Sequence, residues 1–337
     1  MKTLKYGAEQ AVKNCAKVNS KERVVVITDI ETFKIGSMIS KEALKITNNV
    51  QLYVMEDYGK RTDRNPLKFP KEIGMALNHA DVSFYVAGGK KGEIQSFRNP
   101  MLNIISKRAA KKKIRHIHMI GVNEKIMKTG MAVDYKKVAK MTAKIAKIVK
   151  KSKQIRVTTS AGTDFVTTFS PDYKWIAVDG SFKMGEWSNL PDGEVFTCAK
   201  NCNGIIVVDG LLGDFFGAKY GIMKNQPLIM YIKNSRVVKF ECKNKKILRE
   251  IKEYSKIDKN ANRIGEFAIG TNIGLKKLVG IMVQDEKFPG IHVAMGHGYS
   301  EVTGANWNSK AHLDCVLLKT TIEVDGKIIM KKGEFLV

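Results

Sequence analysis

The sequence predicts an α/β amino-terminal domain, doubly wound around a mostly parallel sheet, followed by a β-rich α+β domain. Three observations lead to this fold class. The chain has 337 residues, which fits two domains at about 100–200 residues each. Short apolar segments alternate with helical ones up to residue 153, and Thr- and Val-rich alternating segments follow. The composition, 44% hydrophobic and 27% charged, is typical of a globular protein.

The first half alternates strands and helices in a regular order. Apolar runs predict strands over 23–29, 51–57, 81–88 and 115–121, and helical spacing predicts helices over 35–46, 70–80, 93–113 and 124–153. This alternation favours a parallel sheet covered on both faces. Gly88, Gly89 and Gly92 follow no dinucleotide-binding or phosphate-loop pattern, so we expect them to form turns.

The second half has the texture of a β domain. Residues 154–170 are predicted to form two strands joined by a turn around Ala161 and Gly162. Further strands are predicted over 175–179, 204–208, 227–232, 236–241 and 316–324, and helices only at about 245–256 and 270–279. We therefore expect the domains to be 1–153 and 154–337.

The chain is strongly basic, with a formal net charge of +25. The positive charge is densest over 107–153, where lysines recur every three or four residues opposite an apolar face. Such a surface attracts polyanions. However, Lys greatly outnumbers Arg, and residues 136–153 contain no aromatic side chain for base stacking. A solvated helix face is the favoured interpretation, and a nucleic-acid partner is possible but not favoured.

The chain is expected to be cytoplasmic. Its five cysteines are odd in number and scattered, which suits a reducing compartment (Cys15, Cys198, Cys202, Cys242 and Cys315). No apolar run approaches the roughly 20 residues that span a bilayer, so no membrane association is expected. Residues 1–20 have the pattern of an amphipathic helix and lack the apolar core of a signal peptide.

Histidines gather near the carboxyl end. Three of the six lie between positions 292 and 312: His292, His297 and His312. If 312–318 is a strand, His312 and Asp314 project from one face, which makes a two-ligand platform for a divalent metal. His292 lies in another β-like run and could add a third ligand. The alternative is a surface histidine beside a solvated aspartate.

Two glutamates lie in apolar surroundings. Glu194 begins a predicted strand after a Pro-Asp-Gly turn, and Glu266 is flanked by Ile264 and Phe267. A carboxylate is costly to bury unless it is paired or coordinated. Either glutamate could instead face solvent, and Glu286 lies in a loop-like segment where solvation is the default.

The glycines around His297 would allow a close backbone approach, so this segment is a candidate binding loop. Tyr299 follows and could offer its hydroxyl to a developing oxyanion. The alternative is an exposed turn with one packed aromatic ring. Cys198 and Cys202 lack a second cysteine pair, and we expect them to be ordinary buried thiols.

Four segments together resemble the metallo-aminopeptidases of the thermophilic aminopeptidase T (leucyl aminopeptidase-like) type. They are NLPDGEVFT (189–197), RIGEFAIGTN (263–272), DEKFPGIHVAMGHGY (285–299) and AHLD (311–314), in the family's order. The resemblance covers the second domain, and the chain is shorter than typical members. It implies that the second domain binds metal and carries catalysis.

The resemblance also implies roles for individual residues. The metal ligands would be Glu194, Glu266, Glu286, His292, His312 and Asp314, and the catalytic residues Glu266 and Tyr299. The family has a ligand glutamate five residues before its first histidine. Here Lys287 lies five residues before His292, and Glu286 lies six.

These roles lead to a functional hypothesis. The protein would be an aminopeptidase in which two divalent ions, such as zinc, cobalt or manganese, share a hydroxide that attacks the first peptide bond. Glu266 would relay the proton to the leaving amine, and Tyr299 would stabilise the oxyanion. The family also implies a homodimer and a peptide substrate.

Two alternatives remain open at this stage. The aminopeptidase fold resembles that of dihydroxypyridine ring-cleaving dioxygenases, which hold one iron on two histidines and an aspartate. His292, His312 and Asp314 would make that set, whereas Glu194 and Glu266 are wanted only for a second metal. The other alternative is a non-catalytic basic protein that binds polyanions.

Overall fold

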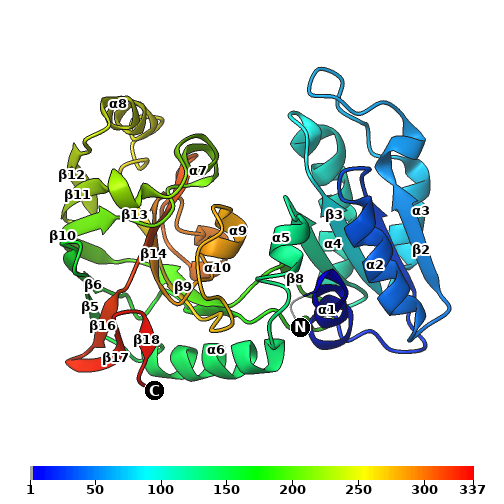
Figure 1. Cartoon of the computed structure of the whole chain (residues 1–337), viewed down its shortest axis with the longest axis horizontal. Coiled ribbons are helices and arrows are strands. Elements are labelled where there is room, and N and C mark those ends of the chain that lie inside the picture. Colours follow the sequence, from blue (N-terminus) through cyan, green and yellow to red (C-terminus); the bar gives the residue numbers. More distant parts are fainter. Residues whose placement is uncertain (1–2) are drawn as a thin grey trace. The chain divides into compact units, whose positions relative to one another are not determined.

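The computed structural model describes residues 3–337, so positions 1 and 2 of the predicted amino-terminal helix lie outside it. The chain forms two compact units. The first contains the residues up to Ala139 and Gly180–Asp192, and the second contains Lys140–Asp179 and Gly193–Val337. The expected domains divided at 153, so the structure differs at two places. Residues 140–153 belong to the second unit, and 180–192 return to the first (Figure 1).

The first unit has a five-stranded parallel sheet, which confirms the predicted α/β class. The strand order is β2-β1-β3-β4-β8. The strands are β1 (Val24–Thr28), β2 (Val50–Val54), β3 (Val82–Ala87), β4 (Arg115–Ile120) and β8 (Trp187–Asn189). Strands β1, β3 and β4 lie within the predicted segments, and β2 begins one residue before its predicted segment. Strand β8 was not predicted, because three residues with one apolar side chain give no periodic signal.

Helices cover both faces of this sheet. They are α1 (Leu4–Glu9), α2 (Phe33–Leu44), α3 (Lys71–His79), α4 (Asn99–Ala110) and the short α5 (Glu124–Met127). Val25 and Ile27 of β1 share one apolar cluster with Ile73 of α3 and Ile105 of α4. On the opposite face Thr28 lies against Gly36 of α2, where a Cβ atom would come within 2.6 Å. Every β1 residue is consequently buried.

A buried ion cluster lies where β1 ends. The Arg61 guanidinium bonds Asp29 at 2.6 Å and Glu93 at 2.8 Å, and the Gly88 N–H donates to Asp29 at 2.7 Å. Gly89 has a positive φ of 81°, which fits the predicted turn. The carboxylates at this edge of the sheet are thus hydrogen-bonded by groups of the protein itself.

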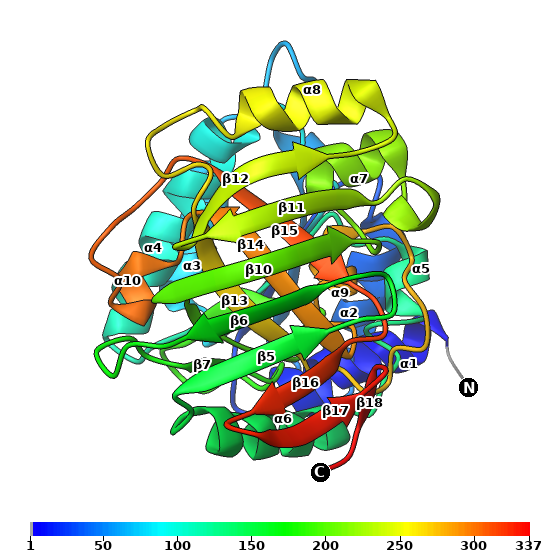
Figure 2. The same ribbon diagram turned by 90° about the vertical axis from the view of Figure 1, so that its left-hand side faces the viewer.

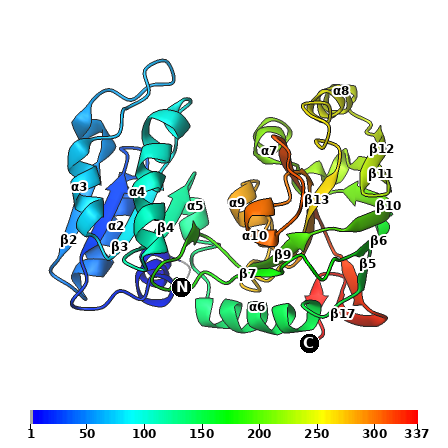
Figure 3. The same cartoon turned by 180° about the vertical axis from the view of Figure 1, so that it is seen from behind.

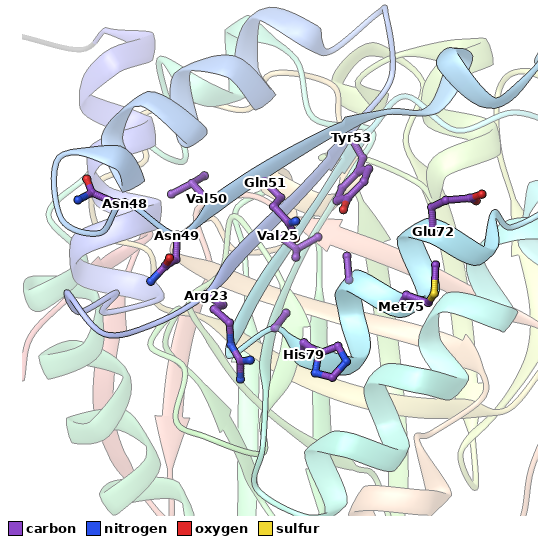
Figure 4. Close-up of a pocket in the computed structure, with 12 residues that line it drawn as sticks. Arg23, Val25, Asn48, Asn49, Val50, Gln51, Tyr53, Glu72, Met75 and His79 are labelled. Atoms are coloured by element: carbon purple, nitrogen blue, oxygen red, sulfur yellow. The ribbon is translucent and has the colours of Figure 1, made fainter.

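A pocket of about 590 Å³ opens beside the edge strand β2 (Figure 4). Arg23, Tyr53, Glu72, Met75 and His79 are among its lining residues. All of its walls come from the first unit, and none of the predicted site residues lines it.

The second unit contains two antiparallel sheets, which confirms the predicted β-rich domain. The eight-stranded sheet has the order β12-β11-β10-β6-β5-β16-β17-β18, and the five-stranded sheet has the order β15-β14-β13-β9-β7. Figure 2 shows the larger sheet in front of the smaller one, with strands crossing steeply. Phe165 and Ile206 of the larger sheet share a core with Phe267 and Val293 of the smaller.

The second unit consists mainly of strands. Its strands are β5 (Gln154–Thr158), β6 (Asp164–Thr168), β7 (Ile176–Val178), β9 (Glu194–Cys198), β10 (Asn201–Val208), β11 (Leu228–Lys233), β12 (Arg236–Glu241), β13 (Ile264–Gly270), β14 (Gly290–Gly296), β15 (His312–Leu317), β16 (Thr321–Val324), β17 (Lys327–Lys331) and β18 (Glu334–Phe335). Its α-helices are the greater part of α6 (Tyr135–Val149), which begins in the first unit, and α7 (Asp214–Tyr220), α8 (Lys245–Tyr254), α9 (Met282–Asp285) and α10 (Ser300–Thr303).

The basic helix α6 has the predicted solvated face. Lys140, Lys144 and Lys147 are exposed, whereas Ile145 and Val149 belong to the core of the second unit. Within residues 3–337, no helix is long and apolar enough to cross a membrane.

The predicted helix over 270–279 is wrong. This segment is irregular, because its backbone groups bond to other parts of the chain. The Thr271 N–H donates to the Gly193 carbonyl at 2.8 Å, and the Asn272 N–H donates to that of Lys287 at 3.0 Å. Gly270 itself lies so close to Phe288 that a Cβ atom would be 2.1 Å from its carbonyl oxygen.

Candidate metal centre

The five-stranded sheet brings the predicted ligands together. Strand pairing sets Glu266 opposite Ala294, and Ala294 opposite Asp314. Residues directly opposite each other, and residues two apart on a strand, project from the same face of a sheet. Glu266, Ala294 and Asp314 thus form one row across the sheet. The other three predicted strand ligands lie an even number of positions along their strands from this row: Glu194, His292 and His312. All five predicted strand ligands therefore share one face. Figure 3 shows α9 and α10 beside these strands.

The side chains converge on a cluster of nitrogen and oxygen atoms. His292 Nε2 lies 3.6 Å from Glu194 Oε2 and 3.7 Å from Glu266 Oε1. His312 Nε2 lies 3.1 Å from Asp314 Oδ1 and 3.5 Å from Glu266 Oε2. Glu266 therefore presents one carboxylate oxygen to each imidazole.

Three sets of ligand atoms are close enough to hold a metal ion. Within each set the atoms lie within 4.8 Å of one another. The first set is Glu194, Glu266 and His292; the second is Glu266, His312 and Asp314; the third is Glu286, His292 and Asp314.

Both imidazoles are oriented for ligation. Nδ1 of His292 lies 3.0 Å from the Glu286 carbonyl oxygen, and Nδ1 of His312 lies 3.0 Å from that of His297. A carbonyl oxygen only accepts, so each Nδ1 carries the proton and donates it. Nε2 of both rings faces the carboxylates. Metal-binding histidines usually have this arrangement.

Three of the predicted ligands are buried, and the other three, Glu286, His312 and Asp314, are partly exposed. Glu194 is 6% exposed, Glu266 3% and His292 2%. The alternative that the two glutamates face solvent is therefore wrong. Among residues 3–337, Glu194 Oε2 is a buried oxygen with no hydrogen-bond partner. An unbonded carboxylate oxygen beside a correctly oriented imidazole fits a bound cation.

The carboxylates strongly perturb the two histidines. Burial alone would lower the pKa of His292, but Glu266 and Glu194 outweigh it and raise the pKa to about 9. His312 is likewise disfavoured by burial, and Asp314 and Glu266 raise its pKa to about 10. The cluster thus attracts positive charge in the absence of metal.

Glu286 joins the cluster, and a residue that sequence reasoning had not assigned to the site joins it too. Glu286 follows α9 directly and belongs to the third ligand set. Lys287 Nζ lies 2.5 Å from Glu194 Oε1 and 2.8 Å from Glu286 Oε1. The only signal for Lys287 in the sequence is its position five residues before His292.

Tyr299 and His297 lie at the edge of the cluster. The Tyr299 hydroxyl is 3.3 Å from His312 Nε2, and its ring packs against Phe196. Burial, and then the charge of Glu266, raise the pKa of Tyr299, so the phenol stays protonated and able to donate. His297 is 3.4 Å from the exposed Glu301. Its backbone, not its ring, orients His312.

Glycines allow the strands of the site to come close together, as expected for the segment around His297. A Cβ atom on Gly296 would be 2.1 Å from the Ala311 carbonyl oxygen, and one on Gly298 would be 2.8 Å from Cys198 Sγ. Cys198 and Cys202 are buried and free, and burial raises the pKa of each thiol to about 12. Both are therefore buried thiols, as predicted.

The chain belongs to the thermophilic metalloprotease family (M29), whose profile matches residues 93–335. This membership confirms the predicted class of enzyme, a metal-dependent protease. Comparison with curated protein sequences finds no match.

Two solved structures share the fold over nearly the whole chain. One is 2,5-dihydroxypyridine dioxygenase from Pseudomonas putida KT2440, with a TM-score of 0.71, 16% identity, and coverage of 99% of this chain and 97% of that one. The other is AmpT from Thermus thermophilus, with a TM-score of 0.68, 16% identity, and 99% of both chains covered. At this identity the two likenesses show the fold.

Proposed function

We propose that this protein is an aminopeptidase whose metal centre is formed by Glu194, Glu266, His292, His312 and Asp314, with Glu286 at its margin. The observation that carries the proposal is the shared face of the sheet, on which two Nε2 atoms point at buried carboxylates. Mixed imidazole and carboxylate ligands suit zinc, cobalt or manganese. Family membership supports a peptide as the substrate.

Different residues of the chain would perform the separate steps of peptide hydrolysis. A divalent ion bound here would lower the pKa of water and polarise the scissile carbonyl group. Glu266 would hold a proton at Oε1, the oxygen that faces His292, and deliver it to the leaving amine. The protonated Tyr299 hydroxyl would donate a hydrogen bond to the developing oxyanion.

The family resemblance implies two ions, and the first two ligand sets, which both include Glu266, could hold one each. The number of ions depends on Lys287. Its ammonium group forms ion pairs with one carboxylate of the first set and one of the third.

The His312→Ala variant tests the site. We expect it to lose bound metal and aminoacyl-peptide hydrolysis, because it removes a ligand at the most open part of the cluster. Its circular dichroism spectrum should not change. Retained hydrolysis would contradict the assignment, and His79→Ala, an exposed histidine of α3, is the matched control.

A second candidate function is supported by the likeness to the dioxygenase fold and by the positions of His292, His312 and Asp314. Those three residues alone could hold a single iron in an oxygenase. Oxygen uptake with a dihydroxypyridine and ferrous iron would support this alternative. Aminoacyl-peptide hydrolysis with zinc, cobalt or manganese would support the aminopeptidase.

A further inference from the structure

Lys287 places its ammonium group inside the candidate metal centre. Its side chain is only 6% exposed, and its Nζ atom contacts Glu194 and Glu286 at ion-pair distance. Lysine normally carries its charge at neutral pH, and a buried ammonium group is stable when carboxylates surround it. One cation is therefore built into the site by the sequence.

The backbone fixes this lysine in place. The Lys287 carbonyl accepts from the Asn272 N–H at 3.0 Å, and the Lys287 N–H donates to the Gln284 carbonyl at 3.0 Å. A Cβ atom on Gly270 would lie 2.9 Å from the Lys287 carbonyl carbon, so these two segments are in direct contact. Movement of the Lys287 backbone away from the site would disrupt this packing.

The three ligand sets are not equally available to a metal ion. Lys287 pairs with Oε1 of Glu194, a residue of the first set, and with Oε1 of Glu286, a residue of the third. A divalent ion on either carboxylate would lie within a few ångströms of the ammonium group, where two positive charges repel strongly. The second set lies outside these two ion pairs.

The second set also has the geometry of a catalytic site. Glu266, His312 and Asp314 are three protein ligands, which is the number that leaves a coordination position open on catalytic zinc. The side chains of His312 and Asp314 are 25% and 13% exposed, whereas those of His292 and Glu194 are 2% and 8% exposed. Solvent and substrate therefore reach the second set most easily.

We propose that the centre holds one divalent ion at Glu266, His312 and Asp314, and that the Lys287 ammonium group replaces a second ion by neutralising Glu194 and Glu286. This inference rests on the metal centre of the proposed function and specifies its stoichiometry. His292 then keeps Glu266 and Glu194 in position instead of binding a second ion.

Metal counting on the full-length chain tests the proposal. The protein is stripped with chelator, reconstituted with zinc, desalted and analysed for metal, and zinc binding is followed by calorimetry. We expect one ion per wild-type chain, one in Glu194→Gln, and none in Asp314→Asn. Two ions in the wild type would overturn the single-ion proposal and leave the aminopeptidase proposal standing. No ion under any condition would overturn both.

Variants of Lys287 test its role as the second cation. We expect Lys287→Met to bind two zinc ions, because Glu194 and Glu286 lose their ammonium partner, and Lys287→Arg to bind one. The metal-free Lys287→Met protein should melt at a lower temperature than the wild type, and zinc should raise its melting temperature more than that of the wild type. Lys310→Met, at an exposed lysine of the same unit, is the control and should bind one ion.

The outcomes separate the possible roles of Lys287. A Lys287→Met protein that folds and still binds one ion would show that the lysine does not replace a metal. If that variant fails to fold even with zinc, Lys287→Gln is measured in its place under the same criterion. Two ions in Lys287→Arg would also overturn the proposal, because that variant keeps the charge.

Discussion

At the scale of single residues, two buried histidines of β4 form a chain of hydrogen bonds in the first unit. Arg98 lies 3.2 Å from His118 Nε2, His118 Nδ1 lies 3.1 Å from His116 Nε2, and His116 Nδ1 lies 2.8 Å from Ser83 Oγ. A guanidinium group only donates, so His118 accepts at Nε2 and donates from Nδ1. The same reasoning makes His116 donate to Ser83. Both rings are therefore neutral.

This chain predicts a loss of stability in acid. Burial lowers the pKa of His116 to about 3, and burial, with the charges of His116 and Arg98, lowers that of His118. The unfolded protein therefore binds more protons than the folded one below the ordinary value of 6.5. The stability from neutral histidines is complete above that pH and is lost as the pH falls, by about 1.4 kcal/mol per pH unit for each ring.

Urea unfolding between pH 5 and pH 7.5 measures this effect. The His116→Gln variant should show a shallower dependence of unfolding free energy on pH than the wild type. His79→Gln, at an exposed histidine, should match the wild type. An equal slope in His116→Gln and the wild type would contradict the assignment of neutral buried rings.

At the scale of elements, the spacing between β14 and β15 depends on a glycine. Gly296 has a φ of 98°, and a Cβ atom there would lie 2.1 Å from the Ala311 carbonyl oxygen, one residue before His312. We expect Gly296→Ala to combine backbone strain of about 1–2 kcal/mol with overpacking of about 1–3 kcal/mol. The displaced strand would move His312 and weaken zinc binding.

The control for this prediction is Gly326→Ala. Gly326 also has a positive φ, 87°, but no atom lies within 4 Å of the added Cβ. It should show only the strain and keep the zinc affinity of the wild type. Equal zinc affinity in Gly296→Ala and the wild type would show that this close approach does not position the ligands.

The elements also show which parts of the fold and the site could be predicted from the sequence. Strands β1 and β3 are mostly apolar runs buried on both faces, so local sequence identifies them. The pair His312 and Asp314 follows from the two-residue repeat of a strand. The failed helix at 270–279 and the unpredicted β8 depend on contacts with distant segments, which local patterns do not contain.

The same reason limits what could be predicted about the site. Glu194, Glu266 and His292 could be named from their surroundings, but their shared face depends on the order β15-β14-β13-β9, which only the folded sheet determines. Lys287 was visible only as a departure in spacing. Its contact with Glu194, 93 positions away in the chain, comes from tertiary structure.

At the scale of the whole molecule, each unit contains a buried cluster of charged side chains, and the two clusters differ in composition. In the first unit, Arg61 is paired with Asp29, Glu56 and Glu93, and none of the possible metal-ligand sets found among residues 3–337 includes these carboxylates. In the second unit, Glu194, Glu266, Glu286 and Asp314 gather around one lysine and two histidines. The convergence of two imidazole nitrogens with carboxylate oxygens at a partly open position is what distinguishes the candidate metal centre from the Arg61 cluster.

The measurement that tests the account most directly is the metal content of the purified protein together with its activity before and after metal removal. We predict one zinc, cobalt or manganese ion per chain, loss of aminoacyl-peptide hydrolysis on chelation, and recovery of hydrolysis when that ion is restored. Hydrolysis that persists in the metal-free protein would contradict the account. A chain that binds only iron, consumes oxygen with a dihydroxypyridine and hydrolyses no peptide would contradict it as well.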